Sequence, residues 1–300
     1  MAPLRDRLRD RSHLTQILKG ATFAPHAQSS GGFVRSGLFL AVALTVALLA
    51  GCGDDDASSS APAPTQAAKK SNGDPGSAID ERIAVGPNSH LLALRCVGTG
   101  SPTVVLEAGS GSSGIEMFRD LQSRLAKLTT ACTYDRLGTG RSDPPTRRRR
   151  TLDDVTGDLR LLVHAGHVKG PYVLVGASGG GLIAVDYAGR YPDGIAGVVL
   201  LEVGEANPHL INESAGSQRW RNPEHMDWAQ AERRLARRPP TLDSIPLLVV
   251  VARDANANGK YRSAWLDLSS RSRQMTLEGT HDLYLDNPGG VVTAIRSMLG

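Results

Sequence analysis

The chain has 300 residues, of which 40% are hydrophobic and 21% are charged, so it is long enough to bury the core of a full-sized domain. Its formal net charge of +4 comes from residues 1–51, which hold six basic and two acidic side chains. The remainder is therefore neutral. Because a neutral domain gives no electrostatic case for binding nucleic acid, we expect no nucleic-acid partner.

The first 51 residues indicate a signal peptide. Ser36–Gly51 is an apolar run, short for a membrane span, that follows Arg35 as in an export signal. It runs into Leu49-Ala50-Gly51-Cys52, which resembles a bacterial lipobox, where signal peptidase II cuts before a cysteine that is then lipidated. We expect Cys52 to carry the lipid and to anchor the exported protein on the extracytoplasmic side of the cell membrane. The alternative is an ordinary signal peptide, or an N-terminal anchor with an incidental cysteine.

The segment before the apolar run is long for the basic region of a signal peptide. Val34-Arg35-Ser36 would make a normal one, which suggests a misassigned start and Val34, read from a GTG codon, as the true one. Residues 52–78 then comprise the lipidated cysteine and a linker of Asp, Ser and Ala-Pro runs. Such a composition cannot bury enough apolar surface to order itself, so we expect a disordered tether.

Residues 79–300 are expected to fold as one domain. It begins with a β-hairpin formed by Glu81–Val85 and His90–Val97. Thr151 and Asp154 predict a capped start for a helix that ends near His164. The other expected strands are Thr103–Glu107, Thr130–Tyr134, Tyr172–Val175, Gly197–Glu202, Leu247–Ala252 and Arg273–Leu277, and the other helices are Phe118–Leu128, Leu182–Gly189 and one opened by Pro288. Strands that alternate with helices predict a mainly parallel sheet covered on both faces.

The strand Tyr172–Val175 stops at Gly176-Ala177-Ser178-Gly179-Gly180, and a helix follows. In this context the glycine-x-serine-x-glycine pattern is typical of a nucleophile elbow, because small flanking residues let the backbone turn sharply and project the Ser178 hydroxyl. The alternative is a serine that merely fits a tight glycine turn.

Several motifs together resemble the α/β-hydrolase superfamily over nearly all of Glu81–Gly300. In the family's order they are VVLEAGSG from Val104, YDRLGTGRSD from Tyr134, GPYVLVGASGGG from Gly170, AGVVLLE from Ala196 and GTHDLYLDNP from Gly279. The resemblance implies the α/β-hydrolase fold, with an eight-stranded sheet, helices on both faces and a small cap at about residues 203–245.

The resemblance makes Ser178 the nucleophile and His281, which lies between the last strand and the last helix, its general base. Two carboxylates can orient the imidazole. Glu202 ends the strand after the elbow and resembles the acid of hydrolases that use the sixth strand, such as haloalkane dehalogenases. Asp254 follows the seventh strand, where most members carry their acid, but it comes a residue or two early. We favour Glu202 and keep Asp254 as the alternative acid.

By the same resemblance, the amides of Ser110 and Gly179 form the oxyanion hole. Gly179 stands where relatives often have a larger residue, which predicts a slimmer and roomier elbow. The polar loop that contains Asp135-Arg136 is expected to be mainly architectural.

Two cysteines remain after Cys52. In this fold the second strand lies beside the fourth, and these strands carry Cys96 and Cys132, so in an oxidising compartment we expect a disulfide between them. Two unpaired buried thiols are the alternative. Neither a C-x-x-C pair nor a clustered His/Asp/Glu set is present in the sequence, and we expect no metal and no other cofactor.

The implied function is that of an exported, membrane-tethered serine hydrolase, in the first place a carboxylesterase that acts on a small-molecule ester through an acyl-enzyme on Ser178. The alternatives are a catalytically silent binding protein of the same fold, or a peptidase, lactonase or cofactor-free haloperoxidase on the same triad. Substrate choice is expected to reside in the cap, where Trp220 and Trp228 are pocket walls or anchors of the cap.

Overall fold

The computed structural model describes residues 78–204, 222–254 and 263–300. The predicted signal peptide, Cys52 and the linker lie outside the described residues, as does Trp220 in the expected cap. Within the described ranges no helix has both the length and the apolar character that a membrane crossing requires.

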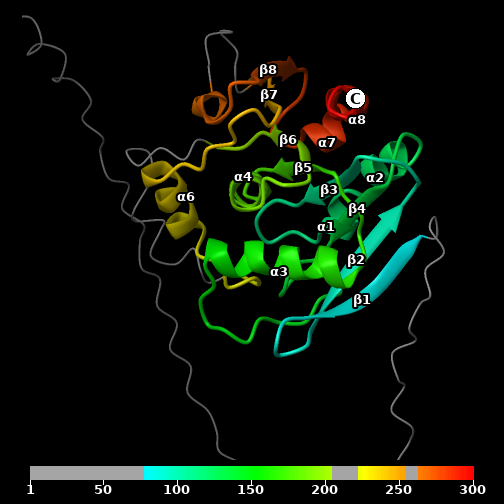
Figure 1. Ribbon diagram of the computed structural model, residues 1–300, viewed down its shortest axis with the longest axis vertical. Helices are drawn as coiled ribbons and strands as arrows, with labels where there is room; N and C mark the ends of the chain where they lie inside the picture. Colours follow the sequence, from blue (N-terminus) through cyan, green and yellow to red (C-terminus); the bar gives the residue numbers. More distant parts are fainter. Residues whose placement is uncertain (1–77, 205–221, 255–262) are drawn as a thin grey trace, which may run out of the picture. The chain divides into compact units, whose positions relative to one another are not determined.

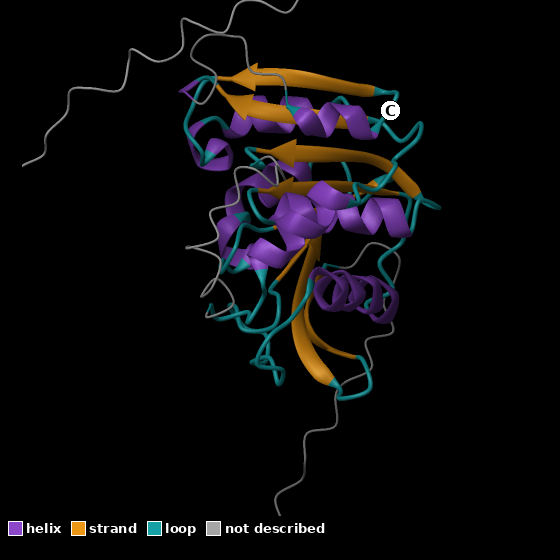
Figure 2. Ribbon diagram, turned by 90° about the vertical axis from the view of Figure 1, so that its left-hand side faces the viewer, coloured by secondary structure: helices purple, strands orange, loops and turns teal. Residues whose placement is uncertain are grey.

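The strands form one eight-stranded sheet with the order β1-β2-β4-β3-β5-β6-β7-β8 (Figure 1). The two pairs β1/β2 and β2/β4 are antiparallel, and every other neighbouring pair is parallel. Figure 2 shows the strands turning through a large angle from one edge to the other, as the inherent twist of strands requires. The strands are β1 Ile79–Val85, β2 His90–Val97, β3 Thr103–Glu107, β4 Ala131–Tyr134, β5 Tyr172–Ala177, β6 Ile195–Leu201, β7 Leu247–Ala252 and β8 Ser272–Leu277. The predicted mainly parallel sheet is confirmed.

Side chains of the central strands alternate between two apolar cores, one on each face of the sheet. In β3, Val105 belongs to the first core, whereas Val104 and Leu106 belong to the second. The first core is covered by α3 Leu152–Ala165, α4 Gly180–Arg190, α6 Trp228–Arg237 and the short helix η2 Ala264–Leu268. The second is covered by α1 Gly114–Met117, α2 Arg119–Leu125, α7 Leu283–Asp286 and α8 Pro288–Arg296, as Figure 1 shows.

Local signals in the sequence correspond to observed helix starts. The side chain of Thr151 accepts a hydrogen bond from the Asp154 amide, and the Asp154 carboxylate accepts one from the Thr151 amide, which is the predicted capping box. Pro288 opens α8 as predicted. The helix predicted up to Leu128 is shorter, because the chain tightens into three-residue turns after Leu125 and leaves Leu128 exposed.

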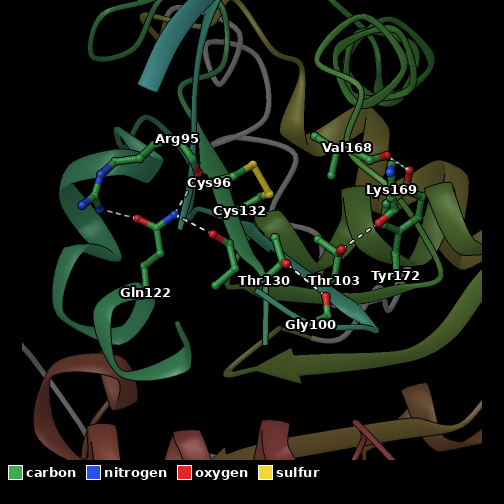
Figure 3. The surroundings of a disulfide bond; sticks show 11 residues. Arg95, Cys96, Gly100, Thr103, Gln122, Thr130, Cys132, Val168, Lys169 and Tyr172 are labelled. Atoms are coloured by element: carbon green, nitrogen blue, oxygen red, sulfur yellow. Dashed lines mark hydrogen bonds between the residues drawn. A yellow bond between two sulfur atoms is a disulfide. The ribbon is translucent and has the colours of Figure 1, made fainter. Parts of the chain in front are cut away.

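A disulfide joins β2 to β4 (Figure 3). Cys96 and Cys132 lie directly opposite each other in the antiparallel register, their Cα atoms are 4.0 Å apart, and both are buried. The second and fourth strands are therefore neighbours, as the prediction of this disulfide assumed. Gln122 of α2 braces the same place, because its Nε2 donates to the carbonyls of Arg95 and Ala131 at 2.8 and 3.0 Å.

Candidate active site

Ser178 lies in a sharp turn between β5 and α4. Its φ of +49° is a left-handed conformation that L-residues rarely adopt, and its amide donates to the carbonyl of Leu201 at 2.9 Å. The glycines of this turn lie where the backbones of neighbouring elements come so close that a side chain would not fit. A Cβ on Gly176 would lie 2.5 Å from the Gly181 Cα, and one on Gly180 would lie 2.3 Å from the Glu107 carbonyl oxygen. The predicted elbow geometry is present, and the glycine pattern serves close packing as well as turning.

Glu202 occupies the equivalent position on the next strand. Ala177 pairs with Leu201, so Ser178 and Glu202 each lie one residue beyond paired strand ends, at the same edge of the sheet. Glu202 also has a positive φ, +50°, and its amide donates to the Val250 carbonyl at 3.0 Å. Two adjacent strands therefore end in the same kind of strained turn, one with a hydroxyl and one with a carboxylate.

The carboxylate of Glu202 is held in a fixed orientation. Its Oε1 accepts a hydrogen bond from the backbone amide of Ala252, and its Oε2 lies 3.8 Å from Nδ1 of His281. Its side chain is 11% exposed, whereas that of His281 is 59% exposed. A separation of 3.8 Å is an ion-pair distance for a protonated imidazole and is longer than a hydrogen bond. Because Nδ1 faces the carboxylate, Nε2 is the ring nitrogen left to accept a proton.

The loop that carries His281 is tied to the residues that follow it. The amide and hydroxyl of Thr280 donate to one carboxylate oxygen of Asp286 at 2.8 and 2.6 Å. The side-chain amide of Asn287 donates to the Glu278 carbonyl at 3.0 Å. The two bonds from Thr280 also lower the pKa of Asp286, which therefore stays ionised in its bracing role.

The structure places the two candidate acids differently. Glu202 contacts His281, whereas Asp254 is exposed, and no hydrogen bond or ion pair among the described residues joins Asp254 to His281. Within the same residues the Ser178 hydroxyl has no hydrogen-bond partner. Catalytic hydrogen bonds are often long or unformed without substrate, so this open geometry is compatible with a triad of Ser178, His281 and Glu202.

The two amides expected to bind an oxyanion belong to Ser110 and Gly179. Within the described residues, neither the Ser110 amide nor the Gly179 amide donates a hydrogen bond, whereas the Gly109 amide donates to Met117 Sδ at 3.4 Å. Gly179 precedes α4, so its amide also lies at the positive end of that helix. We call Ala108–Gly111 the oxyanion loop from here on.

The predicted roomier elbow is wrong. A Cβ on Gly179 would lie 2.3 Å from Ser110 Oγ and 3.0 Å from Cζ3 of Trp228, so these two side chains fill the space that a larger residue would occupy. Trp228 is 5% exposed, and its ring stacks on the guanidinium of Arg136, with 5.7 Å between the ring centroid and Arg136 Cζ. Trp228 was interpreted as either a pocket wall or an anchor of the cap, and its buried position supports the anchor.

A buried charge cluster lies beneath the oxyanion loop. Arg136 is 2% exposed, and the carboxylates of Glu107 and Glu224 that contact it are fully buried. Burial raises the pKa of Glu107 to about 7, against the opposing effect of Arg136. Burial alone would lower the pKa of Arg136, but Glu224 and Glu107 more than offset this and raise it, so the guanidinium stays charged. The sequence signal for the cluster was an acidic residue, Glu107, at the end of an apolar strand.

A hydroxyl at a strand-to-helix turn, a carboxylate after the next strand and a histidine after the last strand form an arrangement typical of hydrolases with a nucleophile elbow. The family model described as "alpha/beta hydrolase fold" matches residues 102–266, which is more than half of the chain. The chain therefore belongs to the α/β-hydrolase family.

Several individual proteins are also similar to this chain. The uncharacterized protein YqjL of Bacillus subtilis strain 168 is 28% identical over 213 residues, which is 66% of this chain and 83% of that protein. A thermophilic esterase from Thermogutta terrifontis superposes with a TM-score of 0.54 at 21% identity, over 75% of this chain and 98% of that chain. An enol-lactonase from Burkholderia xenovorans LB400 superposes with a TM-score of 0.53 at 20% identity, over 73% and 99% of the two chains. At these identities the two superpositions show the fold alone.

Proposed function

We propose that this protein is a serine hydrolase that cleaves small-molecule esters through an acyl-enzyme on Ser178. The observation that carries the proposal is the strained Ser178 turn beside a Glu202–His281 contact of 3.8 Å. The fold also hosts an esterase and an enol-lactonase, and a lactone is a cyclic ester. A lactone is therefore a natural member of the substrate series to be tested.

In the proposed reaction, His281 Nε2 takes the proton of Ser178 while Ser178 Oγ bonds to the ester carbonyl carbon. The carbonyl oxygen becomes an oxyanion that accepts hydrogen bonds from the Ser110 and Gly179 amides. Glu202 stabilises the imidazolium, which then returns the proton to the leaving alcohol as the C–O bond breaks. Water, activated by His281 in the same way, adds to the acyl-enzyme and releases the carboxylic acid and Ser178.

The first experiment combines a fluorophosphonate probe with a chain-length series of nitrophenyl esters. We expect the wild type to be labelled and active, and Ser178→Ala to be unlabelled, with kcat lower by about 10⁴-fold or more. Ser123→Ala, a change at an exposed serine on α2, is the matched control and should behave as wild type. Correctly folded wild type that is neither labelled nor active would instead identify a catalytically silent binding protein.

The second experiment identifies the acid. Glu202→Gln keeps the shape of the side chain but removes the charge that stabilises the imidazolium, so we expect kcat to fall by about 10³-fold or more. Asp254→Asn should leave kcat within about twofold of wild type, since no hydrogen bond or ion pair among the described residues joins Asp254 to His281. The reverse pattern would assign the role to Asp254.

We further propose that the enzyme is exported and held at the cell membrane by a lipid on Cys52. The proposal is supported by the apolar Ser36–Gly51 run and the lipobox-like residues before the cysteine. Mass spectrometry of the mature N-terminus should find a diacylated Cys52, and Cys52→Ala should move the protein from the membrane fraction to the soluble fraction. Peptides from residues 5–19 in mature protein would contradict the proposed cleavage.

A further inference from the structure

Arg136 uses all of its N–H donors on one small region. A guanidinium has five such donors in a rigid planar fork. Nε donates to Glu224 Oε2 at 2.6 Å, and Nη2 donates to Glu224 Oε1 at 3.0 Å. Nη2 also donates to the Gly109 carbonyl at 2.6 Å. Nη1 donates to the Ala108 carbonyl at 2.8 Å and to Glu107 Oε2 at 3.5 Å. Two consecutive carbonyls of the oxyanion loop are therefore held by one buried cation.

The shorter of the two hydrogen bonds to the Gly109 carbonyl comes from Arg136, at 2.6 Å against 3.3 Å from the Ser112 amide, and it helps to fix the direction of the Ser110 amide. The Gly109 carbonyl and the Ser110 N–H belong to the same planar trans peptide group, so they point in opposite directions. Because Arg136 holds the carbonyl on the buried side, the Ser110 N–H is directed away from the charge cluster, and it has no hydrogen-bond partner among the described residues. A cation on the carbonyl also polarises the peptide group and strengthens the N–H as a donor.

The tip of the oxyanion loop is a turn, closed by a hydrogen bond of 3.3 Å from the Ser112 amide to the Gly109 carbonyl. Ser110 is exposed, and a Cβ on Gly111 would contact nothing within 4 Å. A further brace belongs to the cluster, because the Gly111 amide donates to Glu224 Oε1. Glu224 precedes α6, so the loop tip depends on the segment that leads into this helix.

We propose that Arg136, with Glu224 as its buried partner, is the positioning residue of the oxyanion hole, which aims and strengthens the Ser110 amide without touching substrate. This inference rests on the proposed function, since it assigns the amide the work of stabilising an ester-derived oxyanion. It gives the Asp135-Arg136 loop a role in turnover in addition to architecture.

The test is Arg136→Lys, which keeps the charge but loses the planar fork that holds both carbonyls. Arg150→Lys is the matched control. Arg150 is also buried, at 3% exposed, and it pairs with Asp158 of α3 and makes no contact with the oxyanion loop. Circular dichroism and thermal unfolding establish that both variants are folded. If Arg136→Lys does not fold, Glu224→Gln removes the partner carboxylate while keeping its shape.

Two kinetic readouts separate positioning from a merely structural role. We expect Arg136→Lys to lower kcat on nitrophenyl esters by about 10²-fold with KM within about threefold, as for the loss of one oxyanion donor. Ser178 Oγ adds to the carbonyl carbon of a trifluoromethyl ketone, the serine proton passes to His281 Nε2, and the ketone oxygen becomes an oxyanion. The inhibition constant of such a ketone should therefore rise by a similar factor. Glu224→Gln should shift both quantities in the same direction, and Arg150→Lys should shift neither.

The outcomes that test the inference differ from those that test the proposed function. A folded Arg136→Lys with wild-type kcat overturns it, and so does a lower kcat with an unchanged inhibition constant for the ketone. Where wild type itself is inactive and unlabelled, the proposed function fails, and hydrogen exchange of the peptide spanning residues 107–112 still tests positioning. Faster exchange in Arg136→Lys than in wild type and Arg150→Lys supports the inference, and equal exchange overturns it.

Discussion

Glu107 leads to a specific prediction about the pH dependence of stability. Its pKa rises from an ordinary 4.5 to about 7 because the carboxyl is fully buried. A carboxyl with a higher pKa in the folded than in the unfolded protein binds its proton more tightly when folded. The stabilisation that this proton gives to the folded state is therefore complete below pH 4.5 and is lost as the pH rises through 7. At about 1.4 kcal/mol per pKa unit, the loss amounts to about 3 kcal/mol above pH 7.

The substitution Glu107→Gln replaces this carboxyl by a neutral group of the same shape. The free energy of unfolding of the variant minus that of wild type should become more positive by about 3 kcal/mol between about pH 4.5 and 8. The groups that act on the Glu107 charge are Arg136, Tyr134 and Glu224, and all three are unchanged in the variant. Urea unfolding at about pH 4.5, 6 and 8 measures the difference.

Glu116→Gln is the control, because Glu116 is exposed on α1 and pairs with Arg119 at the surface. Its difference from wild type should be nearly the same at each pH, since exposed pairs contribute little. A Glu107→Gln difference that also stays constant would refute the reasoning, because it would mean that Glu107 remains ionised as a partner of Arg136 throughout this range.

Three further predictions concern stability. Gly157 lies inside α3 with nothing within 4 Å of a Cβ position, so Gly157→Ala should raise the free energy of unfolding by about 0.5–1 kcal/mol in urea titrations. Gly180→Ala should lower it by about 1–3 kcal/mol or prevent folding, because its Cβ would overlap the Glu107 carbonyl oxygen; a neutral effect would contradict the close packing of the elbow. Cys96 and Cys132 close a 36-residue span, so reduction should lower the midpoint of thermal unfolding and cost about 2–4 kcal/mol, and two free thiols in unfolded, unreduced protein would refute the bond.

The parts of this fold that were predictable depend on short segments of chain. The hairpin of β1 and β2, the capped start of α3 and the elbow at Ser178 each follow from a few adjacent residues whose backbone preferences agree with the final structure. The positions of Ser178, Glu202 and His281 at strand ends followed from the order of buried strands, because parallel strands all end at one edge of the sheet.

What could not be predicted depends on contacts between distant residues. The hydrogen bonds from Arg136 to Glu224 span 88 residues, so no local pattern identifies their partnership. In the same way, the sequence predicted space at Gly179 because one of the two residues that fill it, Trp228, comes from a helix much later in the chain. The sequence favoured Glu202 as the acid but left Asp254 open, because both follow strands that end at the same edge of the sheet, and the structure shows that Glu202 contacts His281.

The placement of Ser178 and Glu202 after successive strands has an evolutionary consequence. Only α4 and the turns at its ends separate β5 from β6, so the two functional groups are carried by a single strand-helix-strand unit. With Glu202, directly after β6, as the proposed acid, the connection that follows β7 carries no residue of the proposed triad. That connection can therefore gain or lose residues, or acquire new binding contacts, while the spacing of nucleophile and acid stays constant.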